Sequence, residues 1–129
     1  MTTRNSLLRL CENNKDAVII GSIGNISKEL STIDHPKKIL IKGAMGIAMS
    51  VGLGYARQVK EPVIVVIGEG AFLMRMGSMA TIMSNWPDNL RVVILNNGCY
   101  ASCGGQKNNF EKIKHLVPFE VYDDICEQE

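Results

Sequence analysis

The stretch that decides the fold is Val63-Ile64-Val65-Val66-Ile67-Gly68-Glu69-Gly70, a continuous apolar run that ends in two glycines around one carboxylate. A short run of this kind is typical of a strand that is buried on both faces, as in a parallel sheet. Similar apolar runs occur at residues 17–20, 39–41 and 91–95. The sequence therefore predicts four buried strands.

Helical patterns fill the stretches between these strands. They lie at residues 6–13, 27–30, 44–59 and after Gly70, and a last helix is expected near Phe110. Ser27 is placed to cap the second helix. Strands that alternate with helices predict an α/β fold, with an open doubly wound parallel sheet and helices on both faces.

Two of the expected helices have unusual composition. The helix at 44–59 contains Gly46, Gly52 and Gly54, each of which costs roughly 1 kcal/mol relative to alanine, so a sheet or a ligand is expected to approach it closely. The helix after Gly70 is expected to present one apolar face, with its methionines as core filler. That face comprises Phe72, Met76, Met79, Met83 and Trp86.

Length and composition indicate one globular domain over residues 1–129, with 46% hydrophobic and 21% charged residues. The net charge of +1 gives no electrostatic basis for binding nucleic acid or a membrane surface. No run of eighteen apolar residues occurs, and the first twenty residues carry several charges. We therefore expect no membrane span, no signal peptide and a cytoplasmic location. The four cysteines are expected to be reduced, because a core of this size makes disulfides unnecessary. Cys99 and Cys103 are not expected to bind zinc, because no second pair or nearby histidine completes a site.

Polar and glycine-rich clusters follow the expected strands, where the carboxyl ends of the strands lie. These clusters are Gly21-Ser22, Gly43, Gly68-Glu69-Gly70 and Asn96-Asn97-Gly98. Ligands of open α/β sheets bind at this edge. A phosphate-binding P-loop is excluded because no Lys-Ser or Lys-Thr pair follows the glycines, and no three-glycine dinucleotide motif opens a helix.

The remaining signal is one carboxylate and one amide oxygen at neighbouring strand ends, beside glycine N–H groups at a helix start. Such N–H groups bind anions, and the oxygen ligands suit Mg²⁺. The residues therefore predict a Mg²⁺ ion that bridges the protein to a diphosphate.

With these motifs in order, the chain resembles the diphosphate-binding domain of thiamine diphosphate enzymes, whose motif is Gly-Asp-Gly, a spacer of this length, and Asn-Asn. The resemblance runs from about residue 17 to residue 106, and several of its motifs look like those of sulfopyruvate and phosphonopyruvate decarboxylases. Besides the central motif, it is carried by Ser22-Ile23-Gly24 with Ser27-Lys28-Glu29-Leu30, Gly43-Ala44-Met45-Gly46, Leu73-Met74-Arg75-Met76-Gly77 with Ala80-Thr81-Ile82, and Gly104-Gly105-Gln106.

Residue by residue, the resemblance implies a metal site and a cofactor site. The side chains of Glu69 and Asn97 and the backbone carbonyl of Cys99 would bind Mg²⁺. Thiamine diphosphate would lie against the remaining residues, with Met45 as the apolar wedge that keeps it bent. These residues are Ser22, Gly24, Met45, Gly68, Gly70, Ala71 and Asn97.

The resemblance also implies what the chain does not contain. The glutamate that activates the cofactor lies on a separate pyrimidine-binding domain, so no catalytic residue is assigned to this chain. We expect a partner subunit with that domain, self-association, and a short 2-oxo acid that is decarboxylated to an aldehyde. The chain would be the diphosphate- and metal-binding subunit of a thiamine diphosphate-dependent carboxy-lyase.

The sequence departs from the family at one central position, because the family's aspartate is Glu69 here. The chain also stops at Glu129, which makes the expected thiamine diphosphate-binding fold a shortened one. The alternative function is therefore a non-catalytic binding or assembly protein that has kept the fold and lost metal-dependent catalysis.

Overall fold

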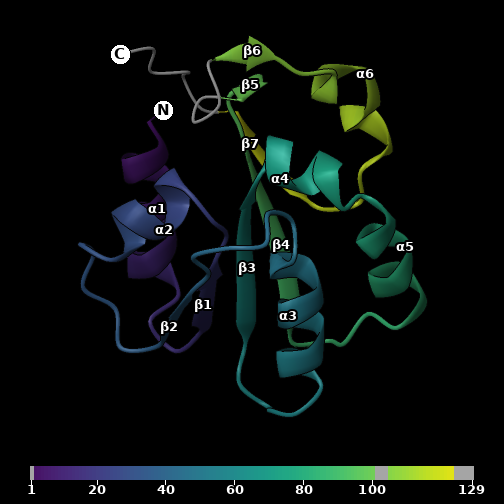
Figure 1. Cartoon of the computed structure of the whole chain (residues 1–129). Helices are drawn as coiled ribbons and strands as arrows, with labels where there is room; N and C mark the ends of the chain where they lie inside the picture. Colours follow the sequence, from purple (N-terminus) through teal and green to yellow (C-terminus); the bar gives the residue numbers. More distant parts are fainter. Residues whose placement is uncertain (1, 101–104, 124–129) are drawn as a thin grey trace.

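A five-stranded parallel sheet forms the centre of the molecule, which a computed structural model describes for residues 2–100 and 105–123 (Figure 1). The strand order is β2-β1-β3-β4-β7, and every neighbouring pair is parallel. The bounds are β1 Val18–Gly21, β2 Lys38–Leu40, β3 Val63–Gly68, β4 Leu90–Asn96 and β7 Glu120–Asp123. The doubly wound α/β fold is confirmed, and β7 is a fifth strand that was not predicted.

Helices cover both faces of this sheet (Figure 1). α1 and α2 lie on one face, while α3, α4, α5 and α6 lie on the other. Their bounds are α1 Thr3–Asn13, α2 Asn25–Leu30, α3 Ala48–Ala56, α4 Glu69–Met74, α5 Gly77–Ser84 and α6 Phe110–Ile113, the last continued by a 3-10 turn, η2, at Lys114–Leu116. A small antiparallel hairpin of β5 (Cys99–Tyr100) and β6 (Gln106–Lys107) follows β4.

Alternate side chains of the strands enter two separate cores. In β3, Val63, Val65 and Ile67 pack toward α3 and α4, whereas Ile64 and Val66 pack toward α1 and α2. All five side chains are fully buried. Burial on both faces explains why the strand is a continuous apolar run rather than an alternating one.

The third helix starts later than predicted, at Ala48 instead of residue 44. Ala44 and Gly46 both have positive φ angles, +52° and +93°, which a right-handed helix excludes. Gly52 lies inside the helix, and a Cβ atom there would stand 2.1 Å from the Val65 Cγ2 atom. The close approach that we expected at these glycines is therefore found at Gly52, where the helix packs against the sheet.

The segment after Gly70 is two short helices rather than one. α4 ends at Met74 and α5 begins at Gly77, which changes the direction of the chain. Phe72 is fully buried and Met79 half-buried, but Met76 is 41% exposed and Met83 is 55% exposed. The prediction that these two methionines are core filler is wrong.

The expectations for Ser27 and for the cysteines had different outcomes. Ser27 is not a helix cap, because α2 begins at Asn25 and Gly24 is its N-cap. The Ser27 hydroxyl is buried and donates instead to the carbonyl of Ser22, at 2.7 Å. Cys11 is buried and free, as expected, whereas Cys103 and Cys126 and the side chain of Cys99 lie outside the described residues.

The strand order creates a topological switch point between β1 and β3. From β1 the chain passes to β2 on one side and then returns across β1 to β3 on the other, which makes the β1/β3 boundary a switch point. Ligands of open α/β sheets bind at such a point, beyond the carboxyl ends of the strands. None of the helices in the described ranges is long and apolar enough to span a membrane.

Candidate functional site

Glu69 is the buried acid at the carboxyl end of β3, and its side chain is only 2% exposed. It is the first residue of α4, where a negative charge is favoured by the helix dipole. One carboxylate oxygen accepts the backbone N–H of Asn97 at 3.1 Å, and the other accepts the side-chain amide of Asn108 at 3.0 Å. The structure therefore brings Glu69 and Asn97 together, as the sequence predicted.

The two asparagines at the end of β4 have different surroundings. The Asn96 amide is buried and donates to Glu111 at 2.7 Å and to Asp123 at 2.9 Å, while its oxygen accepts the N–H of Gly98. Asn96 thereby ties the end of β4 to α6 and β7. Asn97 is half-buried and meets Glu69 through its main chain. Asn97 is thus the asparagine of the pair that faces the acid, and Asn96 is the one that holds the turn.

The carboxyl of Asp123, at the end of β7, has a lowered pKa. Both of its oxygens accept hydrogen bonds at 2.7 Å from the Lys114 ammonium. This ion pair, with the additional bond from the Asn96 amide, holds the pKa of the Asp123 carboxyl below its usual value.

Asn108 is a site residue that the sequence analysis did not identify. Its backbone N–H donates to the carbonyl of Gly98 at 3.1 Å, which closes the β5–β6 hairpin at its base. Its side-chain amide then reaches Glu69, and its side-chain oxygen accepts the N–H of Phe110 at the start of α6. The only sequence signal was a second Asn-Asn pair, Asn108-Asn109, ahead of an expected helix.

Ser22 and Gly24 lie at the end of β1, on the other side of the switch point from Glu69. Ser22 is buried, and its N–H donates to the carbonyl of Val66 in β3 at 2.9 Å. Gly24 is exposed and has a φ of +90° as the chain turns into α2. Both residues therefore lie at the sheet edge where the sequence predicted a ligand.

Met45 projects from the strained loop between β2 and α3. Ala44, beside it, is in the left-handed region, which costs a non-glycine residue about 1–2 kcal/mol. A Cβ atom on Gly46 would stand 2.9 Å from the carbonyl oxygen of Ala71 and 2.3 Å from Cγ of Arg75. The loop is therefore packed directly against α4, and Met45 is half-buried against the core on that face.

Gly68, Gly70 and Ala71 surround the start of α4. Gly68 is the N-cap and has no side chain that could accept the first N–H groups of the helix. Gly70 and Ala71 are buried in the first turn. The backbone of Cys99 begins the hairpin strand that follows Asn97 and Gly98, and it pairs with Lys107.

Glu69 and Asn97 are of residue types that bind hard divalent cations, and the contact between them here is a hydrogen bond from the Asn97 backbone N–H. A buried carboxylate stands beside an asparagine at the ends of two adjacent strands, and carboxylate and carbonyl oxygens are the ligands of Mg²⁺. Residues 2–100 and 105–123 contain no cluster of three or more His, Cys, Asp or Glu side chains that could hold a metal. The predicted ligand set contains a single carboxylate.

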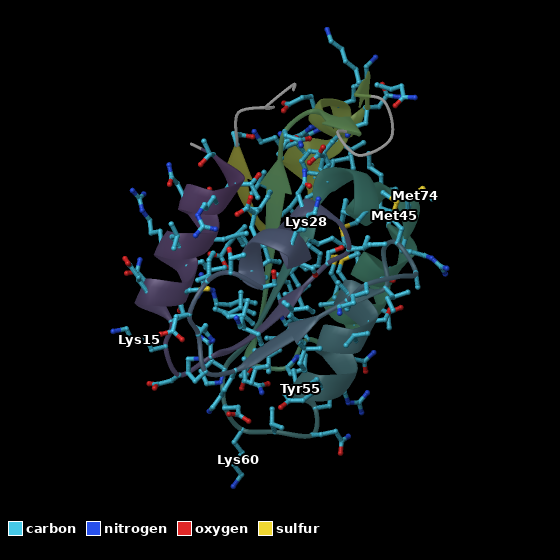
Figure 2. The ribbon with its side chains drawn as sticks, turned by 60° about the vertical axis from the view of Figure 1, so that its left-hand side comes forward. Lys15, Lys28, Met45, Tyr55, Lys60 and Met74 are labelled. Atoms are coloured by element: carbon cyan, nitrogen blue, oxygen red, sulfur yellow. The ribbon has the colours of Figure 1, made fainter. Side chains whose placement is uncertain are left out.

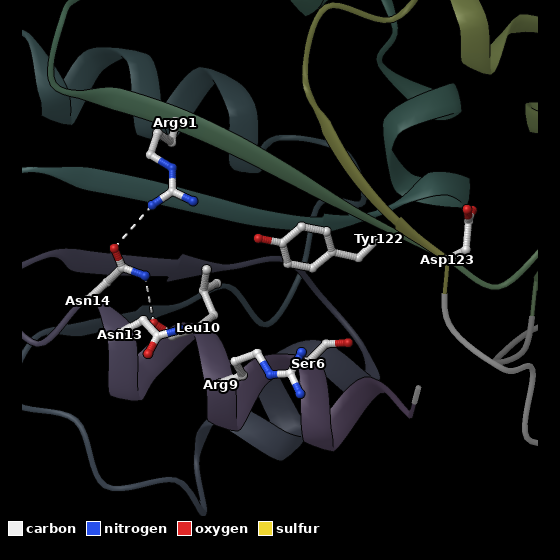
Figure 3. Close-up of a pocket in the computed structure, with 8 residues that line it drawn as sticks. All are labelled: Ser6, Arg9, Leu10, Asn13, Asn14, Arg91, Tyr122 and Asp123. Atoms are coloured by element: carbon white, nitrogen blue, oxygen red, sulfur yellow. Dashed lines mark hydrogen bonds between the residues drawn. The ribbon is translucent and has the colours of Figure 1, made fainter.

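A hollow of about 580 Å³ lies on the face of the sheet that α1 covers, between α1 and β7 (Figure 3). Arg91 is held there by the carboxylate of Glu120 at 2.8 and 2.9 Å and by Asn14 at 3.1 Å. Tyr122 points into the same space (Figure 3). This hollow includes none of the residues that the sequence analysis assigned to the cofactor or the metal.

Comparison with known proteins identifies the family. The family model for the thiamine pyrophosphate enzyme C-terminal TPP binding domain matches residues 20–124. A phosphonopyruvate decarboxylase of Streptomyces viridochromogenes is 43% identical over 99 residues, covering 76% of this chain and 25% of its own length. A sulfopyruvate decarboxylase subunit beta of Methanocaldococcus jannaschii is 40% identical over 100 residues, covering 77% of this chain and 53% of its own length.

The fold has solved counterparts as well. A 2-oxoglutarate:ferredoxin oxidoreductase from Magnetococcus marinus superposes with a TM-score of 0.63 at 22% identity, over 82% of this chain and 37% of that one. This likeness shows the fold alone. The chain spans about a quarter of the phosphonopyruvate decarboxylase and about half of the sulfopyruvate decarboxylase subunit. By its match over residues 20–124, the chain belongs to the thiamine pyrophosphate enzymes, as a C-terminal TPP binding domain.

Proposed function

We propose that this chain is the diphosphate- and metal-binding subunit of a thiamine diphosphate- and Mg²⁺-dependent decarboxylase of short 2-oxo acids, of the sulfopyruvate or phosphonopyruvate type. The observation that carries the proposal is the position of the buried Glu69 carboxylate at the end of β3, where it accepts the backbone N–H of Asn97, at the end of the adjacent β4, at 3.1 Å. The relatives' names, phosphonopyruvate decarboxylase and sulfopyruvate decarboxylase subunit beta, support the substrate class.

In this proposal Glu69, the side chain of Asn97 and the backbone carbonyl of Cys99 hold Mg²⁺. A carboxylate has about four lone-pair sites, so the hydrogen bonds that Glu69 accepts from Asn97 and Asn108 do not by themselves prevent it from coordinating a cation. A cation held there would neutralise charge on the diphosphate. The bond from Asn108 fixes the direction of the carboxylate, as outer-shell partners of metal ligands do.

Thiamine diphosphate would bind at the switch point between the ends of β1 and β3. The N–H groups of Gly70 and Ala71 at the start of α4, beside Gly68, would hold its diphosphate, and Ser22 and Gly24 would line the β1 side. Met45 supports the cofactor from the strained loop, whose cost in conformational energy is consistent with a functional constraint. When bound, the cofactor supplies the carbon that adds to the keto group and takes up the electrons released as CO₂ leaves.

The partner in this proposal is a companion subunit that carries a pyrimidine-binding domain. The matched relatives include chains named subunit beta, which implies a second kind of subunit in those enzymes. The companion would supply the acid that activates the cofactor. The active site then lies between chains, and this chain's residues bind and orient the cofactor.

One observation favours the alternative of a non-catalytic binding protein. Both oxygens of Glu69 already accept hydrogen bonds that join α4, the end of β4 and the segment at Asn108. A glutamate can therefore act here as a structural link without any metal. In that case the chain would associate with partners and take up no cofactor.

The test is an activity assay on the complex. The chain, co-purified with the companion subunit of its own organism, is mixed with thiamine diphosphate and Mg²⁺. Release of CO₂ is then followed with sulfopyruvate and, separately, with phosphonopyruvate. The proposal predicts turnover of at least one of the two acids, and its loss when EDTA removes the metal before the cofactor is added. A stable complex that neither binds the cofactor nor releases CO₂ would establish the alternative.

A further inference from the structure

The hollow between α1 and β7 is lined mainly by side chains that carry polar groups. Its helix wall presents Ser6, Arg9 and Asn13, whose spacing places them on one side of α1. Its sheet wall presents Arg91 from β4 and Tyr122 from β7 (Figure 3). A volume of about 580 Å³ lies within the range of small-molecule binding sites. The hollow is therefore large enough for a small organic ligand that has polar groups of its own.

The sheet wall of the hollow does not suit an apolar occupant. Further along β4, Val93 and Leu95 face the same side of the sheet as Arg91, and both are buried in the core. At the hollow this apolar pattern gives way to Arg91 and its partner Glu120. Covering charged groups with an apolar segment costs free energy unless every polar atom keeps a partner. A ligand that brings oxygen acceptors avoids that cost.

Arg91 is held in one orientation in the sheet wall. Its Nε and Nη2 atoms donate to the two carboxylate oxygens of Glu120 at 2.9 and 2.8 Å, and its Nη1 atom donates to the Asn14 side chain at 3.1 Å. Tyr122 also interacts with the Arg91 guanidinium. A guanidinium held on two of its edges is a rigid wall, and its charge is balanced by Glu120.

Arg9 supplies the positive charge of the hollow that no neighbour balances. Arg91 is paired with Glu120, and Asp123, at the other end of the hollow, is paired with Lys114 at 2.7 Å. Within residues 2–100 and 105–123, none of the ion pairs includes Arg9, and its side chain is exposed. The lining of the hollow therefore has a surplus of positive charge, which favours a negatively charged ligand.

Tyr122 and Leu10 offer the hollow a surface for the carbon part of a ligand. Leu10 is buried in α1 and lines the hollow from the helix side. Tyr122 is half-buried and points into the hollow, above Arg9 in the view of Figure 3. A tyrosine ring packs against flat or apolar groups, while its hydroxyl stays available for a hydrogen bond. An anion bound by Arg9 can thus rest its body against Tyr122.

We propose that this hollow binds a small organic anion, a carboxylate or a phosphate, whose oxygens accept hydrogen bonds from Arg9 and whose body lies against Tyr122. Guanidinium groups form their strongest hydrogen bonds with carboxylate and phosphate oxygens. The site is separate from the cofactor edge. Lys15, just after α1, and Met45, beside the cofactor edge, lie on opposite sides of the molecule (Figure 2). The inference therefore goes beyond the proposed function and does not depend on it.

The test titrates the isotope-labelled full chain with phenyl phosphate and, separately, with benzoate, and follows the backbone amide signals by NMR. Each probe joins an anionic group to a flat apolar body. Benzyl alcohol carries the same ring without the charge and is the neutral control probe. We expect saturable shifts at the amides of Asn13 and Tyr122 with at least one anionic probe, and weaker binding as salt is added.

Substitutions test the role that the proposal gives to Arg9. Arg9→Gln removes the charge and should lower the affinity for the bound probe by about tenfold or more, whereas Arg9→Lys keeps the charge and should retain part of the affinity. Arg57→Gln removes the same charge from an exposed position at the end of α3, on the other face of the sheet, and should leave binding unchanged. Thermal unfolding shows that each variant is folded.

The outcomes distinguish the two chemistries and the two sites. Tighter binding of phenyl phosphate assigns the hollow to phosphates, and tighter binding of benzoate assigns it to carboxylates. The absence of saturable shifts with both anionic probes would overturn the inference. Shifts confined to Gly70 and Ala71 would do the same, because they place the probe at the cofactor edge. Equal binding of benzyl alcohol, or wild-type affinity in a folded Arg9→Gln variant, would also overturn it.

Discussion

The Glu69 carboxylate accepts the backbone N–H of Asn97 at 3.1 Å, across the carboxyl ends of two neighbouring parallel strands. The contact involves the side chain of one residue and the main chain of the other. The side chain of Asn97 can therefore be changed while this hydrogen bond is kept. Substitution of the Asn97 side chain therefore tests the proposed metal site without removing the hydrogen bond between Glu69 and the Asn97 main chain.

Glu69→Asp restores the aspartate of the family motif, and it should change stability and metal binding in opposite directions. The carboxylate retracts by about 1.3 Å, which stretches the bonds to Asn97 and Asn108. We expect a loss of about 1–3 kcal/mol in the free energy of unfolding, measured with urea. We also expect tighter Mg²⁺-dependent binding of thiamine diphosphate, measured by calorimetry on the complex. Unchanged cofactor binding in a folded Glu69→Asp variant would count against Glu69 as a metal ligand.

Asn96→Ala should lower the free energy of unfolding more than Asn97→Ala does, although the two positions are adjacent. Asn96→Ala removes the bonds to Glu111, Asp123 and the N–H of Gly98, and should cost about 2–3 kcal/mol of unfolding free energy. Asn97→Ala keeps the main-chain bond to Glu69 and should cost less. Urea denaturation of the two variants checks the order. The prediction fails if Asn97→Ala is the more destabilised of the two.

Gly52→Ala and Gly54→Ala should have opposite effects on stability within one helix. The first places a Cβ atom 2.1 Å from Val65 Cγ2 in the core, and overpacking of this kind costs about 1–3 kcal/mol. The second meets nothing within 4 Å and should gain about 1 kcal/mol in the isolated chain. Thermal and urea unfolding of both variants provide the measurement. If Gly54→Ala is destabilising instead, part of this chain must occupy the space beside Gly54.

Asp123 should contribute stability that disappears in acid. Its folded-state pKa is lowered by the bonds from Lys114 and Asn96, so its contribution is present above the usual pKa of 3.8 and is lost as the pH falls through the lower folded value. The stability difference between wild type and Asp123→Asn should therefore be present at pH 7 and shrink below about pH 4. The effect is small, because the carboxylate is 60% exposed. Asp88→Asn, at another exposed position, serves as the control substitution.

Four of the five strands, and the meeting of Glu69 and Asn97 at one edge of the sheet, could be predicted from local sequence. A strand such as β3 is apolar at every position because both faces of the sheet are covered, and this pattern is visible without any tertiary information. Glu69 and Asn97 follow two such strands, so a parallel sheet places them at one edge. Both steps depend on local pattern and on one topological rule.

Other features depend on contacts that the sequence pattern does not contain. β7 is short and half-exposed, so it lacks the continuous apolar run of the other strands. The direction of α5 depends on the turn at Arg75 and Met76, which leaves Met76 and Met83 in solvent although their spacing fits a core face. Asn108 reaches Glu69 only because the β5–β6 hairpin folds back onto β4.

The most direct test of the central claim is calorimetric titration of thiamine diphosphate into the chain and its companion subunit, with Mg²⁺ and with EDTA, for wild type and Asn97→Ala. The account predicts saturable binding by the wild type that requires Mg²⁺, and loss of that binding in an Asn97→Ala variant that remains folded and associated. Binding of equal strength in EDTA, or an Asn97→Ala complex that binds as the wild type does, would contradict a metal held between Glu69 and Asn97.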